Sequence, residues 1–424
     1  MSEYITKPGD GFEKIARQVY GDETLTFIIA AANPGAREPF VVGTSLIIPA
    51  DITAPRTKLP QSVNVGLTDV TLAIDGEVFY NWERLRVTRS FDSIDTFSFS
   101  APFEPDDPKF RETFKPFSFK EVVVFVGEDR LFTGTMVDVV PVSEAGRTTM
   151  SVSGYSKPGV LGDCTHPAPN TGFQYEFNNL TVVGMAAALG IPFGVKAIGL
   201  HGAPGAVFAR ESIEPQEKVL TFLAAFAKQQ ELVISSDEDG DLIFQKEKAA
   251  PGTIPEGGET LGTLAATFSQ NEGPINSVIP VFNAQQFYSH VTAFQPVVLG
   301  LGGETYPVKN PHLPGGLRPY NFITPDTQGA AVLKAANGTM GRMYANAVAY
   351  TLEVRTWRNA EGKLWKAGEF ISIQWPEAMI FEPFTFFIRR VNFRKDPDRE
   401  VATLTIILPG GYAGKIPEVL PWDS

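Results

Sequence analysis

The residues best suited to chemistry in this sequence are a cysteine and a histidine two positions apart. Cys164-Thr165-His166 would supply a thiol nucleophile and an imidazole base. A working pair needs the imidazole within hydrogen-bonding reach of the sulfur and oriented by a third group. Residues at i and i+2 of an extended chain share a face without that alignment, and a lone cysteine after apolar Leu161 is typical of core packing. We therefore expect no catalytic site.

Metal-binding patterns are also weak. His201, His290 and His312 lack the short spacing that brings two imidazoles onto one zinc ion. We expect neither a metal site nor a bound cofactor.

Three alternating aspartates, Asp237, Asp239 and Asp241, resemble the start of a calcium loop. Such a loop needs glycine at its sixth position and glutamate at its twelfth, where this chain has Leu242 and Lys248. We interpret the aspartates as a solvated hairpin tip. The run from Gly300 to Glu304 has the glycine density of a phosphate cradle but lacks a following Lys-Ser/Thr, so it is interpreted as a loop.

Length and composition limit the classes of protein to which this chain could belong. The 424 residues suggest about three or four domains, and a 43% hydrophobic and 20% charged composition is typical of a globular protein. A single cysteine excludes intrachain disulfides. The net charge of −12 argues against capture of nucleic acid through its phosphates, and we expect no sequence-specific nucleic-acid binding. No apolar run approaches the ~20 residues of a membrane span. The N-terminus lacks a secretory signal, which indicates a protein that is made and kept in the cytoplasm or that leaves by a route other than general secretion.

Hydrophobic periodicity predicts a mainly β chain with α+β insertions. Alternating runs from Val70 onward, including 85–90, predict a small antiparallel barrel over about residues 66–156 with a hairpin at Asp75-Gly76. Two helices follow, one ending at Gly190 and one starting at Pro215, and then a hairpin. Residues 249–275 read as a connection and 302–325 as a loop. The expected domains are an N-terminal module at 1–50, a linker at 51–65, a β-barrel domain at 66–160, an α+β domain at 161–250, a second similar β-barrel domain at 251–410 with a helical insertion near 326–346, and a C-terminal tail at 411–424.

Residues 4–49 predict a βααβ module. A short strand precedes Pro8-Gly9-Asp10-Gly11, and the stripe of Phe12, Ile15, Ala16 and Val19 predicts a first helix. A second apolar helical run ends in Ala32-Asn33-Pro34, and a final strand closes the module between Gly43 and Pro49. The stretch resembles a LysM module over nearly the whole length of that module.

LysM modules bind N-acetylglucosamine-containing glycans such as peptidoglycan. The resemblance implies a groove between the loop after the first strand and the loop before the last strand. Gly11 stands where the family usually has Thr or Ser, so a helix-capping hydroxyl is missing. The same groove could dock a protein, and we favour docking over glycan binding. The groove residues are Gly9, Asp10, Gly11, Phe12, Asn33, Pro34 and Gly35.

Residues 66–410 resemble the baseplate hub proteins of contractile phage tails, specifically the Mu-like hub family related to the late-control protein class. Ser153-Gly154-Tyr155-Ser156, followed by Leu161, Asp163 and Cys164, is similar to that family's Gly-Arg-Ser … Leu-x-Asp-Cys stretch, with Tyr155 in place of the arginine. Further similar segments, in the family's order, are 175–195, 211–246, 362–368, 370–375, 386–393 and 403–409.

This second resemblance implies a homotrimer in which each subunit contributes two similar barrels to a pseudo-hexameric ring. Such a ring would join a hexameric tail tube protein to a trimeric central spike protein, with the LysM-like module docking other baseplate subunits. The protein would then be a non-enzymatic virion component of a contractile phage tail or related injection particle, assembled in the host cytoplasm. The alternative is a peptidoglycan-binding LysM protein or a cell-wall hydrolase accessory.

Overall fold

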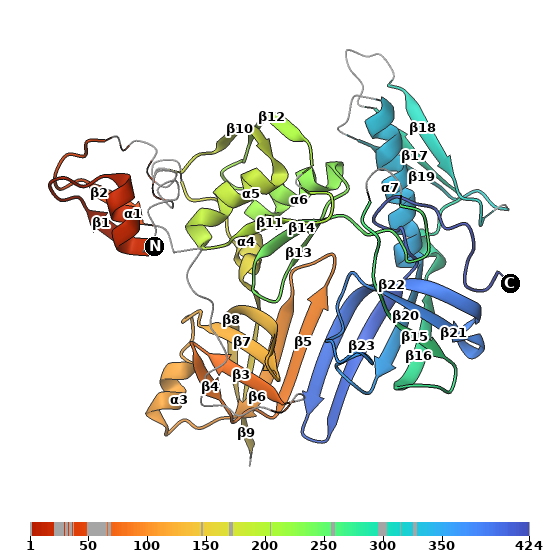
Figure 1. Cartoon of the computed structure of the whole chain (residues 1–424), viewed down its shortest axis with the longest axis horizontal. Coiled ribbons are helices and arrows are strands. Elements are labelled where there is room, and N and C mark those ends of the chain that lie inside the picture. The colour runs from red at the N-terminus through yellow and green to blue at the C-terminus, as the bar shows by residue number, and fades with distance from the viewer. Residues whose placement is uncertain are drawn as a thin grey trace. The chain divides into compact units, whose positions relative to one another are not determined.

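The computed structural model describes residues 2–20, 29, 33, 36, 38–48, 66, 69–145, 147–168, 173–203, 205–255, 259–295, 303–313, 315–324 and 329–423. The chain forms two compact units, the first from residues 1–82 and 93–244 and the second from 83–92 and 245–424. Strands dominate both (Figure 1), which confirms the mainly β class. No helix in these ranges is long and apolar enough to cross a membrane.

The N-terminal module (residues 2–48) joins two antiparallel strands, β1 (Ser2–Ile5) and β2 (Ser45–Ile48). Helix α1 (Phe12–Tyr20) buries Ile15 and Ala16 in a small core with Ile29, Leu46 and Ile48. Phe12 packs against this core as the sequence stripe predicts, but Val19, the last residue of the stripe, is 39% exposed. Most of the expected second helical run and the expected linker at 51–65 lie outside the described residues.

The first unit continues with an antiparallel sheet in the order β6-β9-β8-β7-β3-β4. The Asp75-Gly76 hairpin between β3 and β4 is confirmed, with φ of 53° and 82° at its two turn residues. The strands are β3 (Val70–Ile74), β4 (Glu77–Phe79), β6 (Thr96–Pro102), β7 (Glu121–Val126), β8 (Asp129–Glu144) and β9 (Arg147–Ser156), and α3 (Pro108–Thr113) follows β6.

An α+β segment completes the first unit. Helix α5 (Val182–Gly190) is capped by Thr181, whose Oγ1 accepts a hydrogen bond from Gly184 N. Helix α6 (Val219–Gln229) starts later than the predicted Pro215, because residues 214–217 close a turn first, with Glu217 N–H bonded to Glu214 O. The other elements are α4 (Val160–Asp163), β10 (Glu176–Thr181) paired with β12 (Val207–Ser212), and the sheet β11-β14-β13 (Ala197–Gly199, Leu242–Gln245, Val233–Ser236).

The second unit is built on a sheet in the order β16-β20-β23-β22-β5, and β21 pairs with both β22 and β15. Strand β5 (Arg84–Ser90) pairs with β22 in an antiparallel register. One expectation was wrong here, because the expected connection at 249–275 contains β15 (Leu264–Ser269). The other strands are β16 (Ile275–Phe282), β20 (Val348–Val354), β21 (Phe370–Trp375), β22 (Ile380–Asp396) and β23 (Arg399–Ile407).

A smaller sheet, in the order β18-β17-β19, is inserted in the second unit. Its strands are β17 (His290–Phe294), β18 (Thr305–Lys309) and β19 (Pro319–Ile323), and α7 (Gly329–Ala347) packs against β17 and β18. The predicted loop at 302–325 is therefore wrong over both outer strands. Proline and glycine suggested a loop, but prolines are tolerated in strands that lie at a sheet edge.

Candidate interaction sites

Asp10, one of the residues predicted to line a groove, is engaged within its own module. Its carboxylate accepts hydrogen bonds from Lys7 N (2.8 Å) and the Tyr4 hydroxyl (2.9 Å), and Lys14 Nζ lies 2.9 Å away. The Lys7 N–H, followed by Lys14, lowers the pKa of Asp10 to about 2. Asp10 therefore fixes the loop between β1 and α1.

Asn33 also bonds inside the module. Its Nδ2 donates to Ile29 O (2.8 Å) and Ile47 O (2.7 Å), while its Oδ1 accepts from Ile47 N (2.8 Å). The side-chain amide of Asn33 thus connects the backbone at Ile29 to β2. Pro34 and Gly35 lie outside the described residues.

The missing hydroxyl at Gly11 is replaced from elsewhere in the chain. The Glu38 carboxylate accepts a hydrogen bond from Phe12 N at the start of α1. A Cβ on Gly11 would lie 2.9 Å from Glu38 Oε1, so glycine leaves room for this cap. The Phe12 ring packs edge-on against Phe40 at 4.8 Å. Gly9, with φ of 74°, forms the preceding turn.

Cys164 is half-buried, and His166 packs among aromatic rings. His166 is 4% exposed and meets the rings of Phe173 and Tyr175 edge-on at 5.7 and 5.3 Å. Burial lowers the pKa of His166 to about 4, so the imidazole is neutral near pH 7. Within the described ranges, no group of three His, Cys, Asp or Glu residues could hold a metal ion.

The aspartate hairpin corrects the interpretation as a solvated tip. Asp237 Oδ1 accepts from Asp239 N (3.1 Å) and Asp241 N (2.8 Å). Asp239 also forms an ion pair with Arg130 of β8 at 3.2 Å, and Asp241 is 7% exposed. The tip is packed because Asp237 forms hydrogen bonds within the turn and Asp239 forms an ion pair with Arg130 of β8.

The second unit carries an apolar surface that the sequence did not single out. Strand β16 ends the sheet order, and Ile279, Val281 and Phe282 are 55%, 49% and 44% exposed. A neighbouring hollow of about 270 Å³ is lined mainly by apolar side chains. Its lining includes Phe282, Phe287, Val348, Met379 and Trp422. Alternation in INSVIPVF shows a strand, but only the sheet order shows that it is terminal.

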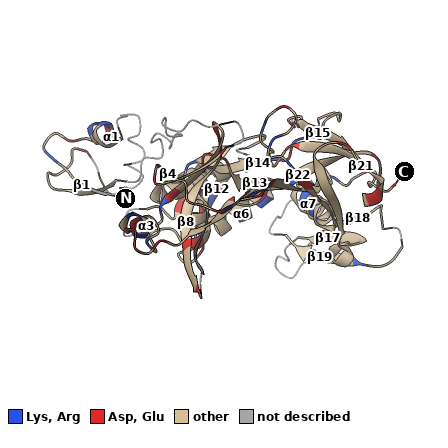
Figure 2. Ribbon diagram, turned by 90° about the horizontal axis from the view of Figure 1, so that it is seen from below, with Lys and Arg blue, Asp and Glu red and all other residues tan. Residues whose placement is uncertain are grey.

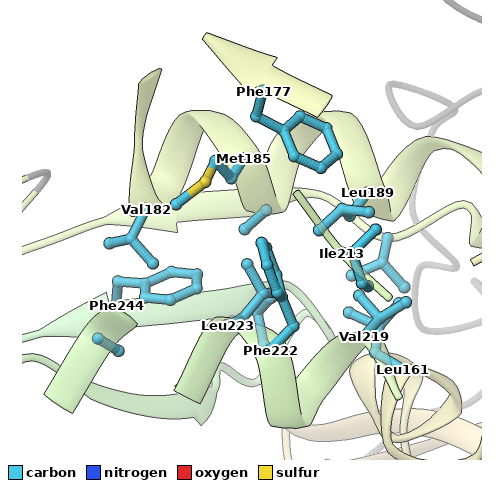
Figure 3. Close-up of a cluster of buried hydrophobic side chains, with 14 of the residues drawn as sticks. Leu161, Phe177, Val182, Met185, Leu189, Ile213, Val219, Phe222, Leu223 and Phe244 are labelled. Carbon is cyan, nitrogen blue, oxygen red and sulfur yellow. The ribbon is translucent and has the colours of Figure 1, made fainter. Parts of the chain in front are cut away.

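The α+β segment has a core of its own, in which α5 and α6 face each other (Figure 3). Met185 and Leu189 come from α5, and Phe222 and Leu223 come from α6. Residues 158–246, which span this core, match the family model "Baseplate hub protein gp44-like, second domain". The match supports a phage baseplate hub family.

Solved structures of tail proteins share the fold of this chain over most of its length. The 43 kDa tail protein of prophage MuSo2 from Shewanella oneidensis is 22% identical, with a TM-score of 0.68 over 81% of this chain and 98% of that one. The tail protein from Neisseria meningitidis MC58 is 20% identical, with a TM-score of 0.66 over 82% and 98%. Prophage tail protein gp18 from Listeria monocytogenes is 10% identical, with a TM-score of 0.50 over 80% and 94%. No curated protein matches the sequence.

Proposed function

We propose that this chain is the structural baseplate hub of a contractile phage tail or a related injection particle, and so a virion component. The observation that carries the proposal is the hub-family match over residues 158–246. The fold shared with two tail proteins over about four-fifths of the chain supports it. In this role the protein is a trimeric adaptor between the hexameric tail tube and the trimeric central spike, and it performs no reaction.

The apolar surface at β16 supports self-association. Exposed apolar patches of this kind mark protein interfaces. The N–H of Asn283 donates to Ala347 O, and backbone groups alternate in direction along an antiparallel strand. The backbone groups of Pro280, three residues earlier, therefore point away from β20. Proline lacks an N–H there, which blunts strand pairing at the free edge. We therefore infer that a second copy packs on the side chains of β16 and the adjacent hollow.

The N-terminal module is proposed to dock a neighbouring tail or baseplate subunit. Asp10 and Asn33, the polar groove residues that a glycan would need, already bond within the module. Glycan recognition relies on free hydrogen-bonding groups to fix orientation. Their engagement supports protein docking over peptidoglycan binding.

Native mass spectrometry of the full chain, alone and mixed with the tube and spike proteins of its particle, tests the proposal. A trimer that binds either partner is the expected result. A stable monomer with no affinity for tube or spike would sink the hub proposal. Deleting residues 1–50 should impair particle assembly; unchanged assembly with loss of peptidoglycan pull-down alone would instead favour the glycan alternative.

A further inference from the structure

Three arginines on one sheet face of the second unit have no acidic partner. Arg84 and Arg86 lie on β5 and Arg390 lies on β22, and all three are exposed. Among the described residues, none of the three forms an ion pair or side-chain hydrogen bond. We name Arg84, Arg86 and Arg390 the arginine face. In an acidic chain such a grouping needs a physical reason.

Strand alternation places these arginines on one side of the sheet. On β5, Leu85 lies between the two arginines and Val87 follows Arg86, and both are fully buried. On β22, Val391 and Phe393 are also fully buried. Side chains alternate along a strand, so Arg84, Arg86 and Arg390 point away from that core. The two arginines of β5 are two residues apart, which is about 6.6 Å along a strand.

The strand register adds a fourth arginine. Arg86 stands directly opposite Arg394 of β22. Like charges in directly opposed positions destabilise a sheet. Arg394 is balanced by Asp396 at 2.6 Å, whereas Arg86 is left uncompensated. An anion bound at this face would remove the repulsion that the folded chain tolerates.

The chemistry between the arginines is polar. Asn392 lies opposite both Thr88 and Thr403, and its Nδ2 donates to Thr88 Oγ1 at 3.2 Å. Arginine, threonine and asparagine are the side chains that contact nucleic-acid phosphates. The core of a stable protein interface is instead depleted in charge and rich in aromatic residues. These strands present no aromatic ring beside the arginines on this face, so bases would have no stacking platform there.

We propose that the arginine face binds the phosphate backbone of duplex DNA without reading its sequence. This inference goes beyond a structural hub role and does not rest on it. A net charge of −12 argues against phosphate capture by the chain as a whole. Figure 2 shows the two signs interspersed on α1 and α3, and the arginine face differs because its cations are unpaired. At moderate salt, screening limits the repulsion from acidic side chains to about 10 Å. The charge of the arginine face itself therefore determines whether a phosphate binds there.

Fluorescence anisotropy of the full chain with a short fluorescein-labelled duplex tests the proposal. Three phosphate contacts predict a log K against log salt slope near −2.7, or about forty-fold weaker binding between roughly 50 and 200 mM salt. The triple variant Arg84→Gln/Arg86→Gln/Arg390→Gln should lose binding and most of that slope. Arg84→Lys/Arg86→Lys/Arg390→Lys should keep the slope, because the charges remain.

A matched control removes the same charge elsewhere. Arg111→Gln/Lys115→Gln/Lys228→Gln alters three exposed cations of the first unit and should leave DNA binding within about twofold of wild type. Equal loss in both triple variants, or no binding by the wild type at low salt, would overturn the proposal. So would displacement of the duplex by polyglutamate at equal charge concentration, because the partner would then be an acidic protein. Thermal melting of each variant checks that it is folded.

Discussion

The backbone N–H of Tyr412 donates a 2.8 Å hydrogen bond to Oε2 of Glu247. Glu247 is only 4% exposed. Gly410 N–H donates to the other carboxylate oxygen at 2.7 Å. One buried carboxylate thereby fixes the segment that follows β23. Burial raises the pKa of Glu247 to about 7, although these backbone N–H groups and Lys415 act in the opposite direction.

This raised pKa predicts a pH dependence of stability. The native state binds the proton more tightly than the unfolded chain, whose carboxyl titrates near 4.5. The stabilisation is therefore complete below about pH 4.5 and is lost as the pH rises through about 7. Glu247→Gln removes the titration. The difference in thermal midpoint between wild type and this variant should shrink from about pH 5 to about pH 8. Glu112→Gln, at an exposed position, should follow the wild type; parallel curves for Glu247→Gln and wild type would contradict the prediction.

Asp92→Asn should destabilise the second unit. Burial opposes ionisation of Asp92, but Arg389 at 2.8 Å and the Tyr412 hydroxyl at 2.7 Å hold the pKa of this carboxyl below its usual range. Breaking such a pair leaves a half-buried guanidinium uncompensated and should cost about 2–4 kcal/mol. Urea denaturation near pH 7 measures the loss. The wild type should lose the same contribution as the pH falls through the depressed pKa, and Asp106→Asn serves as the exposed control.

Gly190→Ala should destabilise the α+β segment, whereas Gly184→Ala should not. A Cβ on Gly190 would lie 2.3 Å from the backbone oxygen of Val195. The same atom on Gly184 would meet side chains at 3.5 Å, an ordinary contact. We expect a loss of about 2 kcal/mol for the first variant and a small gain from helix propensity for the second. Equal melting temperatures would show that the loop at Val195 yields freely.

Ile279→Lys should weaken self-association without unfolding the chain. The side chain is 55% exposed on β16, and a lysine would place charge in the proposed interface. Ile254→Lys is the matched control, since Ile254 is 89% exposed in a loop outside the strands. Sedimentation velocity should show fewer trimers for the first variant only. A wild-type distribution for Ile279→Lys would exclude β16 from the interface.

Local signals in the sequence predicted local structure well. The Asp75-Gly76 turn and the α1 stripe of Ile15 and Ala16 form as expected, because turn type and helical periodicity depend on neighbours in the chain. Strand β5 has equally clear alternation, yet its partner β22 was missed. Pairing depends on residues far away in sequence, and alternation does not encode which strand lies beside it.

The candidate sites show the same limit. Asp10 and Asn33 were identified by position, but only the structure shows that their hydrogen-bonding groups are already used. The arginines were visible in RLRVTRS and RRVNFRK, and no spacing within either run predicts that Arg86 and Arg394 stand opposite each other. That relationship arises from register alone.

The pairing of β5 with β22 also sets an order of events during synthesis. Asp92, directly after β5, and Arg389 of β22 are 297 residues apart, so β5 leaves the ribosome long before its neighbour exists. At about 5–20 residues per second the delay is roughly 15–60 s. Throughout that interval Leu85 and Val87 have no permanent cover from β22. Strand β5 therefore completes its hydrogen bonding on the β22 side only after residues 380–396 have been translated.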